Sequence, residues 1–121
     1  MDWIIIVVTL VLVIAYMFLR RKGQISEDAA VAHLKEGAVL IDVRSPAEFS
    51  TGHLKGAINL PVQQIDTLIV NRVKDREKVV LLHCQSGMRS GVAKKKLDAL
   101  GYTRAYNLGS YARAAHIVHR A

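Results

Sequence analysis

The chain has 121 residues, of which 51% are hydrophobic and 22% are charged, and its formal net charge is +7. This balance excludes an intrinsically disordered chain, and the length is typical of one domain. The single cysteine excludes an intramolecular disulfide and any CxxC metal or redox motif. The positive charge permits anionic substrates, acidic lipids or nucleic acids as partners and does not choose among them.

The first predicted element is an apolar helix. Residues 3–19 carry no charge, and at 1.5 Å per residue they span roughly 25 Å, near the thickness of a bilayer core. Three basic residues, 20–22, follow at once. We therefore predict a single-pass transmembrane anchor over residues 1–22, with the lipid bilayer as a partner. The positive-inside rule places the N-terminus outside the inner (plasma) membrane and residues 23–121 in the cytoplasm.

Two other interpretations of the apolar segment fit less well. A cleaved signal peptide carries its positive charge before the apolar run and a small-residue cleavage site after it. Here only Asp2 precedes the run, and no A-x-A pattern follows it. A buried strand of this length is rare in a small domain. The membrane anchor remains the prediction.

Residues 23–121 alternate predicted helices and strands. Ser26 is predicted to be an N-cap, and Ser45, Pro46 and Glu48 form a capping-box pattern that predicts a short helical turn. Continuous apolar runs predict buried strands, and apolar residues at helical spacing predict the remaining helices. In chain order we predict a helix over 26–37, a strand over 38–43, the turn from 45, a strand over 57–60, a helix over 62–73, a strand over 79–83, a helix marked by Val92, Ala93, Leu97 and Leu100, a strand over 104–108 and a helix over 111–118. This alternation predicts an α/β fold with a parallel sheet and helices on both faces.

The predicted reactive site follows the strand over residues 79–83. Cys84 comes directly after this strand, in a short loop that leads into the next helix. Ligands bind beyond the carboxyl ends of strands in open α/β sheets, and a helix N-terminus presents backbone N–H groups. We therefore expect the Cys84 thiol to be open to solvent with a lowered pKa, and to act as a nucleophile on an anionic substrate. Gly87 allows the loop to turn and Arg89 adds a cation, whereas a cysteine that only fills a core position is the alternative.

Five short motifs occur in order along the domain: Asp42-Val43-Arg44, Glu48-Phe49, GHLKGAINLP over residues 52–61, CQSGMRS over 84–90 and Leu100-Gly101-Tyr102. Together they resemble the rhodanese family of sulfurtransferases over about residues 26–118, at the length of its single-domain members. The N-terminal helix is similar to that of membrane-anchored bacterial members. The resemblance implies a rhodanese-like parallel sheet with helices on both faces, preceded by one N-terminal transmembrane helix.

The resemblance also implies a thiosulfate sulfurtransferase that works without a cofactor. Cys84 would take a sulfur from thiosulfate or a similar anionic donor as a persulfide, and would pass it to a thiol, cyanide or protein acceptor. Arg89 would join Cys84 as a catalytic residue, binding the donor or bracing the loop through Asp42, and Arg44 would line the mouth of the pocket. The full set of implied substrate-binding residues is Gln85, Ser86, Gly87, Met88, Arg44 and Asp42.

Alternatives to this function remain open. Related phosphatases and arsenate reductases have five residues between their cysteine and arginine, whereas four separate Cys84 from Arg89, and the smaller loop favours a sulfur atom. A catalytically idle interaction module that recruits partners at the membrane is the second hypothesis. No metal site is predicted, because His116 and His119 have a metal-compatible spacing but no carboxylate or cysteine nearby. Nucleic-acid binding is not predicted, because basic and aromatic residues do not alternate.

Overall fold

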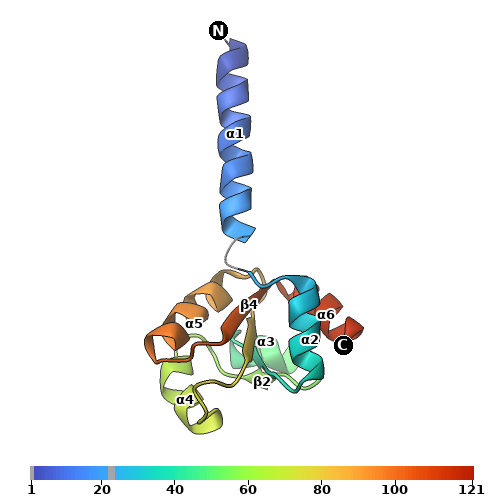
Figure 1. The fold of residues 1–121 in the computed structure, drawn as a ribbon, viewed down its shortest axis with the longest axis vertical. Helices are drawn as coiled ribbons and strands as arrows, with labels where there is room; N and C mark the ends of the chain where they lie inside the picture. The colour runs from blue at the N-terminus through green and yellow to red at the C-terminus, as the bar shows by residue number, and fades with distance from the viewer. Residues whose placement is uncertain (1, 22–23) are drawn as a thin grey trace.

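A long helix, α1 (Asp2–Arg21), projects from an α/β domain (Figure 1). The computed structural model describes residues 2–21 and 24–121. The window Asp2–Leu19 has a mean hydropathy of 2.6, and none of it is buried against the rest of the chain. A helix of this length and composition fits a membrane span or a signal sequence. The predicted boundary between residues 22 and 23 lies outside the described residues.

The domain contains the predicted helices and strands. The helices are α2 (Glu27–Lys35), α3 (Pro46–Thr51), α4 (Ile65–Arg72), α5 (Met88–Ala99) and α6 (Tyr111–Arg120). The strands are β1 (Val39–Asp42), β2 (Ile58–Asn59), β3 (Val80–His83) and β4 (Ala105–Gly109). Both predicted N-caps are confirmed, since the side chains of Ser26 and Ser45 accept hydrogen bonds from backbone N–H groups in the first turns of α2 and α3.

The four strands form one parallel sheet in the order β2-β1-β3-β4. Helices α4 and α5 pack on one face of the sheet, with Ile65, Ile69, Ala93 and Leu97 in their shared core. Helices α2 and α6 pack on the other face, with Ala30, Val31, Ala114 and Ile117. The predicted α/β fold with helices on both faces is therefore confirmed. Because all strands are parallel, their carboxyl ends meet at one edge of the sheet, where Cys84 follows β3.

Two apolar residues within the predicted helices are exposed. Val92 of α5 is 50% exposed and Leu68 of α4 is 38% exposed. The buried faces of these helices use residues four apart, Ala93 with Leu97 and Ile65 with Ile69. One position along a helix turns a side chain by about 100°, which moves Val92 and Leu68 off those faces. Helix α5 also starts earlier than its apolar stripe indicated, at Met88.

Candidate active site

The sulfur of Cys84 lies at the carboxyl end of β3, where the loop to α5 folds around it. The Gly87 N–H donates a hydrogen bond to Cys84 Sγ at 3.0 Å, and the Ser90 hydroxyl lies 3.5 Å from the same sulfur. Gly87 has a φ of +93°, a backbone conformation that residues other than glycine rarely adopt. This turn ends the loop and begins α5, so the N-terminus of the helix points toward the sulfur.

The hydrogen bonds around Cys84 favour its ionised form. Burial acts to raise the pKa of the Cys84 thiol, but hydrogen bonds from the Ser90 hydroxyl and from the backbone N–H groups of Ser90, Gly87 and Ser86 outweigh it. The pKa of Cys84 is therefore lowered from its ordinary value. A larger thiolate fraction makes the sulfur a better nucleophile at neutral pH.

The expectation that Cys84 is open to solvent is wrong for this conformation. The residue is 0% exposed and belongs to the hydrophobic cluster between the sheet and helices α4 and α5, which also contains Ala93 and Val43. Strand alternation directs the Cys84 side chain to the face that α5 covers. The exposed side chains of the loop are those of Gln85, Ser86 and Met88. A reagent that reaches the sulfur must therefore displace part of this loop.

Arg89 is held by Glu48, and not by Asp42 as expected. Its guanidinium donates to the two carboxylate oxygens of Glu48 at 2.6 and 3.0 Å. The guanidinium of Arg89 lowers the pKa of Glu48 to about 2, and the backbone N–H of Ser45 assists. The capping box at the start of α3 fixes the Glu48 carboxylate. The sequence showed Glu48 in two motifs, but nothing local in the sequence connects it with a residue 41 positions away.

Asp42 and Arg44 form a buried ion pair with each other. Asp42 is fully buried, and its carboxylate accepts hydrogen bonds from the Arg44 backbone N–H at 2.9 Å and from Arg44 Nη2 at 2.8 Å. Arg44 Nη2 also donates to the Gly52 carbonyl at 2.7 Å, and its guanidinium lies 4.7 Å from the centre of the Tyr111 ring. The expectation that Arg44 lines the pocket mouth is therefore wrong, because Asp42 draws the guanidinium inward.

His83, the residue before Cys84, is not placed to act as a base for the thiol. His83 points to the face of the sheet opposite Cys84, where it packs edge-on against Tyr111. Burial lowers the pKa of His83, which keeps the ring neutral. His116 does have a carboxylate nearby, contrary to expectation, because packing of α6 against α2 brings its Nε2 to 2.9 Å from Glu27. Within residues 2–21 and 24–121, no group of three His, Cys, Asp or Glu side chains is arranged to hold a metal ion.

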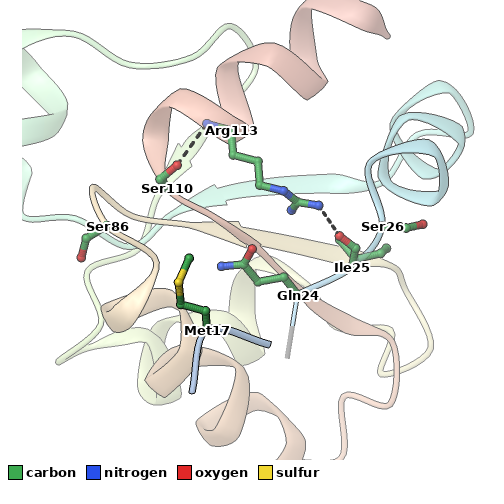
Figure 2. A pocket seen from close by; sticks show the side chains of 7 residues that line it. All are labelled: Met17, Gln24, Ile25, Ser26, Ser86, Ser110 and Arg113. Carbon is green, nitrogen blue, oxygen red and sulfur yellow. Dashed lines mark hydrogen bonds between the residues drawn. The ribbon is translucent and has the colours of Figure 1, made fainter. Parts of the chain in front are cut away.

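Two hollows lie between the domain and the end of α1, on the solvent side of the loop that follows Cys84. The first, about 670 Å³, is lined by Met17 of α1, the segment 24–26, Ser86 of the loop and Arg113 of α6 (Figure 2). Arg113 closes one side of it by donating to the Ile25 carbonyl. The second hollow, about 570 Å³, lies between the end of α1 and α5 and is lined by Ser86, Gly87 and Met88 among others. Cys84 lines neither hollow.

Comparison with known proteins gives consistent matches over the domain. Residues 26–113 match the family model described as rhodanese-like domain. The thiosulfate sulfurtransferase PspE of Escherichia coli (strain K12) is 39% identical over 69 residues, which cover 57% of this chain and 66% of that protein. The uncharacterized protein YqhL of Bacillus subtilis (strain 168) is 45% identical over 71 residues, which cover 59% of this chain and 55% of that protein. The chain thus spans less than two thirds of the length of either relative.

A solved structure matches the fold over a larger share of both chains. The human single-domain sulfurtransferase TSTD1 matches with a TM-score of 0.66 and 28% sequence identity. The match covers 78% of this chain and 96% of that chain.

Proposed function

Because the chain belongs to the rhodanese-like domain family and has named sulfurtransferases among its relatives, we propose that it transfers sulfane sulfur through a persulfide on Cys84. The observation that carries this proposal is the set of hydrogen-bond donors around the sulfur, with the Gly87 N–H at 3.0 Å and the Ser90 hydroxyl at 3.5 Å. Donors fixed in these positions stabilise a thiolate before the transfer and a persulfide anion after it.

The proposed reaction has two steps. The Cys84 thiolate attacks the outer sulfur of thiosulfate or a similar donor, the S–S bond of the donor breaks, and sulfite leaves with the electron pair. A thiol, cyanide or a nucleophilic group of a protein then attacks the outer sulfur of the persulfide, and Cys84 leaves as a thiolate. Both steps use one cysteine, which suits a chain that contains one.

The exposed loop residues would meet the donor first. Gln85, Ser86 and Met88 are exposed, whereas Cys84 is covered. In the proposed reaction the loop opens as the donor binds, and Arg89 shares its charge between Glu48 and the anionic donor. Asp42 and Arg44 would support the loop from beneath, because they are bound to each other and buried.

The proposal includes the membrane anchor. Residues 1–22 would form a single-pass anchor and residues 23–121 the rhodanese-like domain, with the N-terminus outside the inner membrane and the domain in the cytoplasm. The apolar window of α1 and the three basic residues that follow Leu19 support this orientation. A tethered enzyme meets a membrane-bound sulfur donor or acceptor at a raised local concentration.

Intact-mass measurement tests the persulfide. The reduced full chain, incubated in detergent with thiosulfate, is expected to gain one sulfur, about 32 Da, and to lose it again when cyanide is added. Peptide mapping should place the added mass on the peptide that contains Cys84. Absence of any gain with thiosulfate and with a polysulfide would contradict the proposed reaction.

A second candidate function is an interaction module that recruits partners at the membrane without turnover. One observation favours it: Cys84 is fully buried and packs as part of the hydrophobic core. A small apolar cysteine in that position would need no reactivity. The same mass measurement decides between the two functions, because an idle module forms no persulfide with any donor.

Replacing Arg89 by alanine is expected to lower kcat/KM for thiosulfate roughly tenfold while the melting temperature changes little. The variant removes a cation beside the donor site, and a hydrogen bond to a charged group contributes about 1.5–3 kcal/mol. The Arg89 and Glu48 side chains are 37% and 36% exposed, and exposed ion pairs contribute only about 0–1 kcal/mol to stability. Steady-state kinetics and a thermal melt measure both effects.

The matched control is Arg120→Ala, which also removes an exposed arginine that is paired with carboxylates, those of Glu27 and Asp28, on a helix of the same domain. Its kinetics should equal those of the native chain. If Arg89→Ala unfolds the domain, Arg89 is mainly structural; if its kinetics also equal those of the native chain, Arg89 takes no part in the transfer.

A further inference from the structure

We propose that the domain docks on an anionic lipid surface through three residues of α5, Met88, Val92 and Lys95, which we call the α5 strip. This inference rests on the proposed membrane anchor and goes beyond it, because an anchor alone leaves the domain free to turn any face toward the bilayer. Three observations carry it: the chain length between α1 and the domain, the hollow between α1 and α5, and the chemistry of the strip.

The chain ties the active-site edge of the domain to the end of α1. Gln24 forms a parallel β-bridge with Asn107 of β4, and the Ile25 N–H donates to the Asn107 carbonyl at 3.2 Å. The side-chain amide of Gln24 packs against Gly87 and Gly109, at the base of the loop. Helix α1 ends at Arg21, and three Cα–Cα steps reach at most roughly 11 Å. The loop edge therefore stays beside the end of the span.

The end of α1 and the α5 strip line the same hollow, the second one described above. Tyr16 and Leu19 of α1 line it on one side. Helix α5 lines the other side with Met88, Val92 and Lys95, and with Lys94 and Asp98, which form an ion pair with each other. Figure 1 shows the start of α5 near the foot of α1. Tyr16 and Leu19 lie in the last turns of the apolar window, which corresponds to the headgroup level of a bilayer. Lipid is therefore the molecule that surrounds this hollow in a membrane.

The α5 strip has the composition of an interfacial surface. Met88 and Val92 are 69% and 50% exposed, and their spacing of four places them on one helix face, with Lys95 one turn further. Exposed apolar residues next to a lysine enter the boundary between headgroups and acyl chains and attract anionic lipids. The sequence carries three further basic residues, 20–22, directly after Leu19. Docking would turn the exposed loop residues toward the surface, so donor and acceptor would approach along it.

Site-specific quenching in vesicles tests the docking. The full chain with Cys84→Ser, which leaves only the introduced thiol, carries an environment-sensitive fluorophore on Val92→Cys. The matched control carries it on Glu77→Cys, an exposed residue just before β3 at the opposite end of the sheet. In vesicles of phosphatidylcholine with phosphatidylglycerol, headgroup-linked nitroxide lipids should quench position 92 several-fold more than position 77. Equal quenching at the two positions overturns the proposal.

Two variants test how much the positive charge of Lys95 contributes to docking. In anionic vesicles, Lys95→Gln is expected to lower the ratio of docked to undocked domain about fivefold. Lys74→Gln, which removes an exposed lysine that follows α4, should leave the ratio unchanged. Quenching at position 92 that is the same with and without phosphatidylglycerol overturns the assignment of an anionic lipid surface.

Vesicle flotation distinguishes failure of the docking proposal from failure of the proposed membrane anchor. A chain that does not float with the vesicles has no membrane anchor, and the docking proposal fails with the anchor. A chain that floats while position 92 stays unquenched has an anchor and no docking. Neither readout uses sulfur transfer, because Cys84 is absent from the labelled chain. The persulfide proposal is therefore tested independently of the docking.

Discussion

Replacement of Cys84 by serine is expected to reduce sulfur transfer from thiosulfate to cyanide at least ~10³-fold and to abolish the gain of mass. The serine hydroxyl stays protonated at neutral pH and forms no persulfide. The domain should remain folded, because serine is close to cysteine in size. Initial-rate kinetics, intact mass and a thermal melt on the same preparation measure these results. Transfer that persists in this variant would place the chemistry elsewhere.

The Ser90→Ala variant is the matched control for this experiment. It keeps the thiol and removes the hydroxyl that lies 3.5 Å from Cys84 Sγ. Hydrogen bonds lower the pKa of Cys84 in the native chain, so the thiolate fraction, and with it the rate, declines as the pH falls through that pKa. Loss of the Ser90 donor raises the pKa, and the decline should begin at a higher pH. An unchanged pH profile would show that Ser90 does not stabilise the thiolate.

A cellular assay with Cys84→Ser distinguishes enzyme from interaction module. A chain that acts by sulfur transfer should fail to rescue a deletion phenotype when Cys84 is serine. A chain that acts only by recruiting partners should rescue it as well as the native chain does, because the fold and the anchor are intact. Equal rescue would therefore favour the interaction module.

The fold was predictable because its signals are local. The buried strands appear as short apolar runs such as VVLLH over residues 79–83, and the capping box of Ser45 and Glu48 lies within four residues. The strand–loop–helix context of Cys84 is equally local, so its position at the sheet edge could be predicted from the sequence. The predicted α/β architecture with helices on both faces agrees with the structure.

The contacts that complete the candidate site join residues that are distant in sequence. The pairing of Arg89 with Glu48 spans 41 positions, and the burial of Cys84 depends on how α5 packs against the sheet. The sequence offered Asp42 as a partner for Arg89, and only the folded chain shows that Arg44 already neutralises that carboxylate. Residue types and motifs are thus readable from the sequence, whereas the choice among several oppositely charged partners is made by packing.

Replacement of Asp42 by alanine is expected to lower the free energy of unfolding by about 3–5 kcal/mol, the usual cost of removing one member of a buried ion pair. Asp42 is fully buried and Arg44 nearly so. Without the carboxylate, the partners that remain for the Arg44 guanidinium among residues 2–21 and 24–121 are the Gly52 carbonyl and the Tyr111 ring. Urea unfolding of the full chain in detergent, followed by circular dichroism, measures the loss.

Two further variants show that the loss comes from an unpaired buried cation. Glu48→Gln removes the carboxylate of the exposed pair with Arg89 and keeps a side chain that suits the capping box, so it should cost no more than about 1 kcal/mol. The double variant Asp42→Leu with Arg44→Met removes both charges and should recover most of the stability, since apolar residues of similar volume replace buried ion pairs at little cost. If Asp42→Ala costs under 1 kcal/mol, the pair does not stabilise the edge of the sheet. If the double variant is as unstable as Asp42→Ala, the hydrogen bond to Gly52, and not the charge balance, holds that edge.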